Sequence, residues 1–165
     1  MRKTIIGVMG PGDGASVADR ENAYELGKLI ATQGWVLLTG GRKEGVMDAA
    51  NKGAKAADGL TLGILPTNDS HAVSGAVDLA VFTEMGNARN DINVLSSDVV
   101  IACGMGMGTA SEVGLALKAG KKVVLLTNHQ PTQQFFTGFS PDNVFVATSP
   151  ETALTLVKET LTYNF

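Results

Sequence analysis

Three glycine-rich stretches carry the residues whose types and spacing could hold a ligand. Residues 10–15 read GPGDGA, residues 39–45 read TGGRKEG, and residues 102–114 read ACGMGMGTASEVG. Glycine leaves backbone N–H groups open to a ligand, and a helix that begins there adds unpaired amides and the positive end of its dipole. This chemistry favours an anion such as a phosphate. The third stretch adds a hydroxyl, Thr109, and a carboxylate, Glu112.

The elements that position these stretches are predicted by alternating strand and helix patterns. Apolar runs predict strands at residues 5–9, 35–39, 61–65, 79–83, 98–103, 122–126 and 144–147. Because these runs are continuously apolar rather than alternating, we expect strands covered by helices on both faces. Helical spacing joins Leu26, Leu29 and Ile30, then Val46, Ala49, Ala50 and Gly53, and further helices are expected at residues 88–95, 110–119 and 150–161.

Such alternation predicts an α/β fold. We expect a single domain over residues 1–165 with a doubly wound, mainly parallel, Rossmann-like sheet. Ligands of these sheets lie outside the carboxyl ends of the strands. The three stretches follow the first, second and fifth predicted strands, so they meet at that edge. The candidate ligand-binding residues are Gly10, Gly12, Thr39, Gly40, Gly41, Arg42, Arg89, Asn90, Gly104, Met105, Gly106, Met107, Gly108, Thr109 and Glu112.

Composition excludes several classes of protein. The formal net charge is −3 and the calculated pI is 5.3, so the basic footprint of a nucleic-acid-binding protein is lacking. No apolar run reaches the roughly 20 residues of a membrane-spanning helix. A single cysteine, Cys103, precludes an internal disulfide and fits a reducing cytoplasm. Charged residues make up only 18% of the chain, which is consistent with surface buried between copies of it.

Familiar nucleotide and metal motifs do not fit. The spacing in GPGDGA is G-x-G-x-G, and the second strand ends in LLTGGR instead of the acid that holds the ribose of NAD. A Walker loop requires G-K-[ST], which does not occur. His71 and His129 stand apart and read as ordinary loop residues, whereas Cys103 reads as a small core residue rather than a metal ligand.

The segments GGRKEGVMDAANKGA, MGNARND and GMGMGTASE resemble the LOG-like proteins of the lysine decarboxylase-like superfamily. Within that superfamily the chain is most similar to the molybdenum cofactor carrier proteins, which share a GVMGPG first strand and a GMGxGTAxEVxLALKA segment. The likeness runs from Ile6 to about Leu126. It implies a protein that binds, protects, and transfers or stores molybdenum cofactor, a pterin phosphate with a dithiolene-bound metal, without chemistry.

The same resemblance leaves an enzyme as the alternative. LOG-type enzymes are phosphoribohydrolases that cleave nucleoside 5′-monophosphates with an arginine and a glutamate, which Arg89 and Glu112 match. However, Asn90 stands where those enzymes have lysine, and Gly104 and Met105 stand where they have proline and glycine. In the carrier interpretation no residue is catalytic. A third, weaker interpretation is a nucleotide-binding sensor module.

The carrier resemblance suggests a role for each part of the site. Gly106, Gly108 and Thr109 would hold the phosphate, and an arginine, Arg42 or Arg89, would neutralise anionic oxygens. Asn90 and Glu112 offer the donor and acceptor that a pterin edge requires, and Met105 and Met107 offer apolar cover. Structural alternatives remain open: loop packing for the methionines, a salt bridge for Arg89 and a helix cap for Glu112.

The resemblance also predicts the partners. Molybdenum enzymes or cofactor-synthesis proteins would be transient partners, and the chain would form a homo-oligomer, a tetramer in the carriers. Neither nucleic acid nor membrane is expected as a partner.

Overall fold

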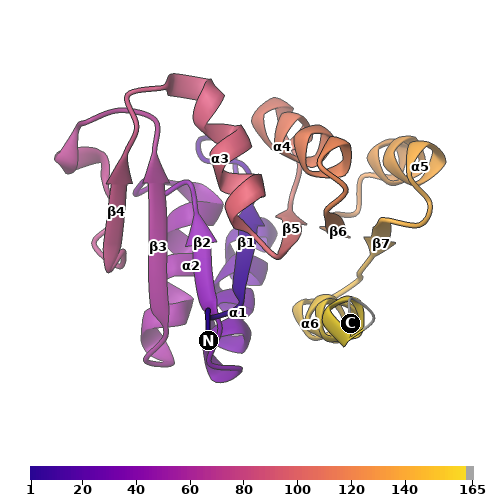
Figure 1. Ribbon diagram of the computed structural model, residues 1–165, viewed down its shortest axis with the longest axis horizontal. Coiled ribbons are helices and arrows are strands. Elements are labelled where there is room, and N and C mark those ends of the chain that lie inside the picture. The colour runs from indigo at the N-terminus through magenta and orange to yellow at the C-terminus, as the bar shows by residue number, and fades with distance from the viewer. Residues whose placement is uncertain (163–165) are drawn as a thin grey trace.

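The chain folds around one seven-stranded parallel sheet. The computed structural model describes residues 1–162, and in it the strand order is β4-β3-β2-β1-β5-β6-β7 with every neighbouring pair parallel (Figure 1). The strands are β1 (Ile5–Met9), β2 (Val36–Thr39), β3 (Leu60–Leu65), β4 (Leu79–Phe82), β5 (Val99–Cys103), β6 (Lys122–Leu126) and β7 (Val144–Val146). The predicted α/β fold class and all seven predicted strands are confirmed, with ends that differ by at most one residue.

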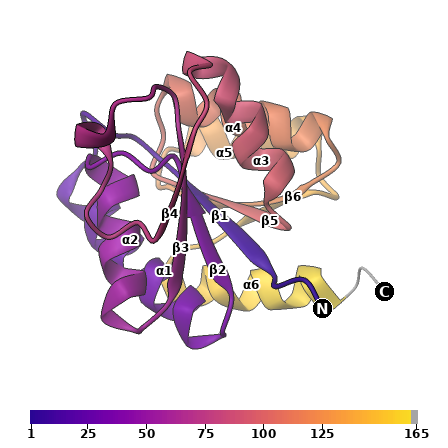
Figure 2. The same ribbon diagram turned by 60° about the vertical axis from the view of Figure 1, so that its left-hand side comes forward.

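Helices cover both faces of the sheet (Figure 2). On one face lie α1 (Val17–Thr32), α2 (Gly45–Ala56) and α6 (Pro150–Thr162), and on the other lie α3 (Arg89–Ser96), α4 (Met107–Lys118) and α5 (Gln130–Phe139). Two short 3₁₀ helices, η1 (Ser70–Ala72) and η2 (Gly86–Ala88), flank β4. Each face has its own apolar core, one centred on β1, α1 and α2 and the other on β5, β6 and α4. A doubly wound sheet results.

Helix α1 packs closely on α2 because a glycine of each helix lies against the backbone of the other. A Cβ added to Gly27 would lie 2.0 Å from the carbonyl oxygen of Ala50, and one added to Gly53 would lie 1.9 Å from that of Tyr24. Any larger residue would therefore push the helices apart. This contact fixes the loop before α2 against the loop before α1, and both loops lie at the carboxyl edge of the sheet.

Three features differ from what the sequence predicts. Helix α4 begins at Met107, three residues before the expected start, so the residues expected in a turn form its first helical turn. Helix α5 was not predicted at all. Strand β4 is exposed along its whole length, with Leu79 53%, Val81 46% and Phe82 44% accessible, although we expected cover on both faces. Strand β4 is an edge strand that no helix of the described chain covers.

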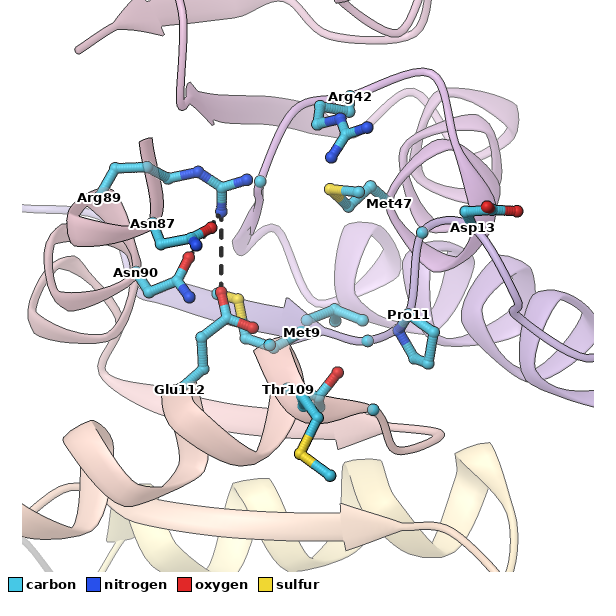
Figure 3. A pocket seen from close by; sticks show the side chains of 17 residues that line it. Met9, Pro11, Asp13, Arg42, Met47, Asn87, Arg89, Asn90, Thr109 and Glu112 are labelled. Carbon is cyan, nitrogen blue, oxygen red and sulfur yellow. Dashed lines mark hydrogen bonds and ion pairs between the residues drawn. The ribbon is translucent and has the colours of Figure 1, made fainter. Parts of the chain in front are cut away.

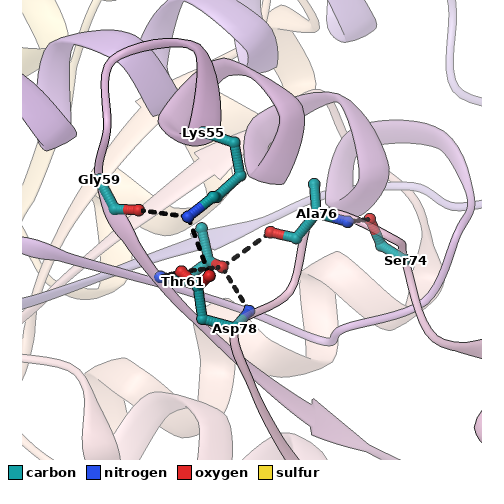
Figure 4. Close-up of polar contacts among 6 residues, drawn as sticks. All are labelled: Lys55, Gly59, Thr61, Ser74, Ala76 and Asp78. Atoms are coloured by element: carbon teal, nitrogen blue, oxygen red, sulfur yellow. Dashed lines mark hydrogen bonds and ion pairs between the residues drawn. The ribbon is translucent and has the colours of Figure 1, made fainter.

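A polar cluster ties the amino ends of β3 and β4 together (Figure 4). The buried hydroxyl of Thr61 donates to the carbonyl of Ala76 at 2.7 Å and accepts from the backbone N–H of Asp78 at 2.8 Å. The Asp78 carboxylate accepts from the Thr61 N–H at 2.9 Å and from Lys55 Nζ at 2.8 Å. This cluster therefore holds the long connection between the two strands in register.

The opposite, carboxyl edge is where the chain reverses its order. Strand β1 lies between β2 and β5, so the connections after β1 and β5 diverge to opposite faces of the sheet. Such a switch point leaves a crevice that the side chains of neither layer fill. Within residues 1–162, no helix has the length and apolarity needed to cross a membrane.

Candidate functional site

A pocket of about 230 Å³ opens at the switch point (Figure 3). The loop after β1, the loop after β2, the segment 87–90 and the start of α4 form its wall. Eleven of the predicted ligand-binding residues line it: Gly10, Gly12, Gly40, Arg42, Arg89, Asn90, Gly106, Met107, Gly108, Thr109 and Glu112. Residues from three separate glycine-rich stretches thus meet in one cavity.

The N-terminus of α4 opens into this pocket without a cap. Its N-cap residue is Gly106, which is extended (φ −155°, ψ 176°) and has no side chain that could accept from the first amides. Space beside the turn is free, because a Cβ added to Gly108 would meet nothing within 4 Å. The first amides of a helix have no partner within the helix. The turn therefore offers N–H donors and a positive dipole end to an anion.

The N-terminus of α1 lies beside the same edge but is closed. There the Ser16 hydroxyl accepts from the N–H of Asp19 at 3.0 Å, and the Asp19 carboxylate accepts from the N–H of Ser16 at 3.0 Å. This reciprocal capping box satisfies the amides that a ligand would otherwise bind. Of these two helices, only α4 presents its amides to the pocket.

An arginine and a glutamate face each other across the pocket. Arg89 Nη1 lies 3.8 Å from Glu112 Oε1, and both side chains are more than 90% buried. Asn93, one helical turn after Arg89, donates to Glu112 Oε1 at 3.0 Å. Asn90 accepts from Arg89 Nη1 at 3.3 Å and donates to the Ser111 hydroxyl at 3.1 Å. Helices α3 and α4 thus hold the two charged groups from opposite sides.

Burial is the largest influence on the pKa values of Arg89 and Glu112. It raises the pKa of Glu112 to about 7, against the hydrogen bond from Asn93 and the charge of Arg89, which both act to lower it. Burial also lowers the pKa of Arg89; the Glu112 charge opposes that change and the Arg42 charge adds to it. An arginine nevertheless remains protonated in a protein. Near neutral pH the pocket therefore holds one fixed cation and one carboxyl group that readily gains or loses a proton.

Two buried polar atoms of the site lack a hydrogen bond. Among residues 1–162 these atoms are Arg89 Nε and Asn93 Oδ1. Leaving such a group unpaired costs roughly 1–3 kcal/mol, and more when the group is charged. The 3.8 Å separation of the ion pair is also beyond hydrogen-bond range. The cluster is incompletely satisfied, which is the state expected of groups that await a ligand.

Arg42 adds a second cation at the rim. It pairs with Glu44 at 2.6 Å and remains 40% exposed. Asp13, on the loop after β1, is the other charged residue of the rim. Because the charge of Arg42 contributes to the lowered pKa of Arg89, an anion between the two side chains would relieve repulsion as well as form ion pairs.

Four predicted residues lie outside the pocket lining. Thr39 is fully buried, bonds to Asn51 at 3.1 Å and accepts from the N–H of Gly41, so it shapes the loop after β2. Gly41, at φ +77°, packs on Leu65 and Gly63. Gly104, at φ +75°, packs on Asp19, and Met105 is half-buried against the core beneath α4. These positions support the loops rather than reach the cavity.

Other residues that line or support the pocket were not predicted from the sequence. Met9, Pro11, Asp13, Met47 and Asn87 line the pocket, and Asn93 supports it from below. Pro11 and Asp13 belong to the GPGDGA stretch and could have been included on that ground. Asn93 carries a weaker signal: it follows Arg89 by four residues, so both lie on one face of α3.

Cys103, His71 and His129 lie outside the pocket lining. Cys103 is fully buried at the end of β5, and burial raises the pKa of its thiol to about 12, so it carries no thiolate at neutral pH. His71 lies in η1 and His129 is the N-cap residue of α5, so neither is in the plain loop that we expected, although both are exposed. Within residues 1–162 no three His, Cys, Asp or Glu side chains are grouped to hold a metal ion.

Comparison with known proteins places the chain in a family. The sequence model of the SLOG cluster4 family matches residues 3–154, and the chain belongs to this family. The solved structure of the molybdenum cofactor binding protein of the phototrophic bacterium Rippkaea orientalis is 59% identical, covers 98% of this chain and 99% of its own, and superposes with a TM-score of 0.96.

Two further comparisons extend this result. The molybdenum cofactor carrier protein of Chlamydomonas reinhardtii is 52% identical over 98% of this chain and 99% of its own, with a TM-score of 0.92. An uncharacterised protein of Archaeoglobus fulgidus is 45% identical over 129 residues, which are 76% of this chain and 82% of that protein. The two solved structures thus match nearly the whole chain at 52–59% identity.

Proposed function

We propose that this member of the SLOG cluster4 family binds molybdenum cofactor non-covalently in the switch-point pocket and carries it as cargo, without chemistry. The observation that carries the proposal is the uncapped N-terminus of α4 facing the buried, incompletely satisfied Arg89. The high identity to a molybdenum cofactor binding protein and a molybdenum cofactor carrier protein supports it.

The chemistry of the pocket fits the charged end of such a cargo. The cofactor ends in a phosphate, and the open amides of α4, the Thr109 hydroxyl and two arginines are suitable donors to its oxygens. Arg89 Nε offers a further N–H donor that nothing in residues 1–162 uses. The amide of Asn90 supplies the donor and acceptor that a pterin edge requires.

The size of the pocket suggests that it holds only part of the cargo. Its 230 Å³ is smaller than the roughly 300–1,000 Å³ typical of small-molecule sites. Wider hollows adjoin it and share its wall, and one of them, on the outer side of α4, is lined by Asn87, Met107, Gly108, Ser111 and Leu115. Met107 is 91% exposed between the two spaces, so its soft side chain can cover a ring that extends outward.

The carrier role is tested by retention of the cofactor. Protein purified without oxygen is mixed with molybdenum cofactor and desalted, and the pterin that elutes with the protein is measured by fluorescence. We expect stoichiometric retention. Passage of the pterin through the column as though no protein were present would refute the proposal.

The enzyme alternative is tested on the same preparation. Arg89 and Glu112 are the pair that a phosphoribohydrolase would use, and the raised pKa of Glu112 would suit a general acid. Incubation with AMP and other nucleoside 5′-monophosphates is followed by chromatography for the free base. We expect none above background. Turnover that Glu112→Gln abolishes would replace the carrier role by an enzymatic one.

We also propose a homotetramer that works in the cytoplasm and passes the cofactor to molybdenum enzymes or takes it from cofactor-synthesis proteins. The uncovered apolar residues of β4, Leu79, Val81 and Phe82, support self-association. Light scattering during gel filtration measures the mass. A monomer at micromolar concentration would contradict the oligomer without affecting the cargo proposal.

A further inference from the structure

Glu112 is an unexpected residue for an anion pocket. The open amides of α4 and the two arginines all favour negative charge, yet a carboxyl group points into the same space (Figure 3). A carboxylate repels an anion unless a proton lies between them. Its presence therefore restricts which anions the pocket accepts.

The carboxyl group is held by only one of its oxygens. Asn93 donates to Oε1 at 3.0 Å, and Arg89 Nη1 lies 3.8 Å from the same atom. Among residues 1–162 no group donates a hydrogen bond to Oε2. The other charged groups that line the pocket are Arg42 and Arg89, both cationic, and the exposed Asp13 at the rim. The free oxygen of Glu112 is thus available to a hydroxyl of a bound molecule.

Oxyanions differ in whether they supply such a hydroxyl. A phosphate monoester has its second pKa at about 6, so it retains a proton in part of its population near neutral pH and gains one easily. Sulfate and terminal metal-oxo groups carry none under these conditions. A P–OH group donates to a carboxylate, whereas a fully deprotonated oxyanion meets only repulsion.

We propose that Glu112 determines specificity in this pocket by accepting a hydrogen bond from a protonated oxyanion, so that the pocket selects a phosphate over oxyanions without a proton. No covalent bond changes, and the proton stays between the phosphate and the carboxylate. If the cargo is molybdenum cofactor, as the proposed function has it, Glu112 also sets its orientation. The phosphate end enters the pocket and the metal-oxo end stays outside.

The protonation of Glu112 is consistent with this role. Burial raises its pKa to about 7, so a proton shared with a phosphate is accommodated with little cost at neutral pH. When Glu112 itself is protonated below that pH, its O–H donates, and the discrimination against sulfate weakens. Selectivity for inorganic phosphate, whose dianion keeps one P–OH at alkaline pH, should therefore be greatest above pH 7, whereas a phosphate monoester shares a proton with Glu112 only near neutral pH and below.

Equilibrium dialysis with radiolabelled inorganic phosphate and inorganic sulfate tests the proposal. At pH 8 we expect the full chain to bind phosphate at least about tenfold more tightly than sulfate. In Glu112→Gln this ratio should fall to within about threefold, mainly because sulfate binds better to an amide than to a carboxylate. At pH 6 the unaltered protein should also lose much of its preference.

Asp13→Asn is the matched control, because it removes one carboxylate from the rim of the same pocket. This substitution changes the electrostatic potential for any anion, so we expect the phosphate and sulfate affinities to rise together. The ratio of the two affinities should stay unchanged. An unchanged ratio in Glu112→Gln, an equal loss of ratio in Asp13→Asn, or binding of neither anion would overturn the inference. Selective phosphate binding by a protein that fails to retain the cofactor would instead refute the proposed function alone.

Discussion

Two polar clusters with similar ingredients lie at opposite edges of the same sheet. At the amino edge, Lys55, Thr61 and Asp78 form a network in which the Thr61 hydroxyl and both oxygens of Asp78 are bonded (Figure 4). At the carboxyl edge, Arg89 and Glu112 stand 3.8 Å apart and a buried Arg89 nitrogen has no partner in residues 1–162 (Figure 3). The first cluster is complete and the second is open.

The protonation of the two carboxyl groups reflects this difference. Burial alone would raise the pKa of Asp78, but the hydrogen bonds from Lys55 and Thr61 outweigh it and hold that pKa below its ordinary value. At Glu112 burial prevails and the pKa rises to about 7. A closed network thus stabilises its charge within the protein, whereas an open one leaves that task to a ligand.

The largest effect on stability is expected at the closed cluster. Thr61→Val keeps the shape of the buried side chain but removes a hydroxyl that accepts from the Asp78 N–H and shares its single proton between the Ala76 carbonyl and the Asp78 carboxylate. It leaves the N–H of Asp78 without its partner, so we expect a loss of about 3 kcal/mol in the free energy of unfolding. Urea denaturation measures it, and Thr61→Ser, which keeps the hydroxyl, is the control. A loss in Thr61→Val no larger than in Thr61→Ser would contradict the assignment.

The pH dependence of stability should differ between the clusters. Because the pKa of Glu112 is raised to about 7 from an ordinary value of 4.5, the native state binds more protons between these values, and stability falls as the pH rises through this window. Glu112→Gln removes this slope. From pH 5 to pH 8 the free energy of unfolding of this variant, relative to that of the unaltered protein, should rise by up to about 3 kcal/mol.

Asp78→Asn provides the contrast for that measurement. The lowered pKa of Asp78 gives stability that is present above the unfolded value and is lost only as the pH falls through the folded one, so its contribution is constant from pH 5 to pH 8. Denaturation curves across this range compare the two variants. A similar change of slope in both would show that Glu112 is not the titrating group.

Ligand binding should depend on the open cluster. Arg89→Met preserves much of the side-chain volume but removes the buried cation, and we expect the affinity for molybdenum cofactor to fall by about 30-fold, which is roughly 2 kcal/mol. Arg2→Met, which removes an exposed ion pair with Asp98 outside the pocket, is the matched control and should bind normally. Titration by pterin fluorescence gives both affinities. Equal affinity in the two variants would exclude Arg89 from the site.

The smallest effect on stability is expected from a substitution that gives the N-terminus of α4 a capping side chain like that of α1. Gly106→Asp supplies α4 with the capping carboxylate that α1 already has, and a Cβ there meets only Pro11 at 3.6 Å. We expect a gain of a few tenths of a kcal/mol in stability and a loss of about tenfold in phosphate affinity. Thermal unfolding and dialysis measure these changes. Gly106→Ala, which cannot cap, should lose little affinity if the carboxylate is the cause.

Much of the fold could be predicted because continuous apolar runs mark buried parallel strands. Helix α5 escaped prediction because its apolar residues, Phe135, Phe136 and Phe139, are confined to its second half, and only Phe136 is buried. The early start of α4 was hidden by Met107 and Gly108, which read as turn residues but have space in a first helical turn. The exposure of β4 has no local signal, since its sequence is as apolar as that of a covered strand.

The loops that form the site could be predicted from the sequence, but the residues that pack beneath them could not. Glycine positions indicated which loops converge, yet the sequence cannot distinguish Gly108, which faces open space, from Gly41 and Gly104, which adjust the packing of their loops. Asn93 was missed because a buried asparagine is recognised only when its partner, Glu112, is known to face it. Such distinctions depend on contacts between different elements, such as the packing of α3 on α4, which the sequence pattern of either element does not show.

Hydrogen exchange with and without molybdenum cofactor tests the central claim most directly, because it compares both clusters in one experiment. We predict that the cofactor slows amide exchange at residues 106–112 and 87–93, around the open cluster, and leaves residues 61–78 unchanged. Protection confined to another part of the chain, or no protection when the cofactor is present in excess, would contradict the assignment of the switch-point pocket as the cargo site.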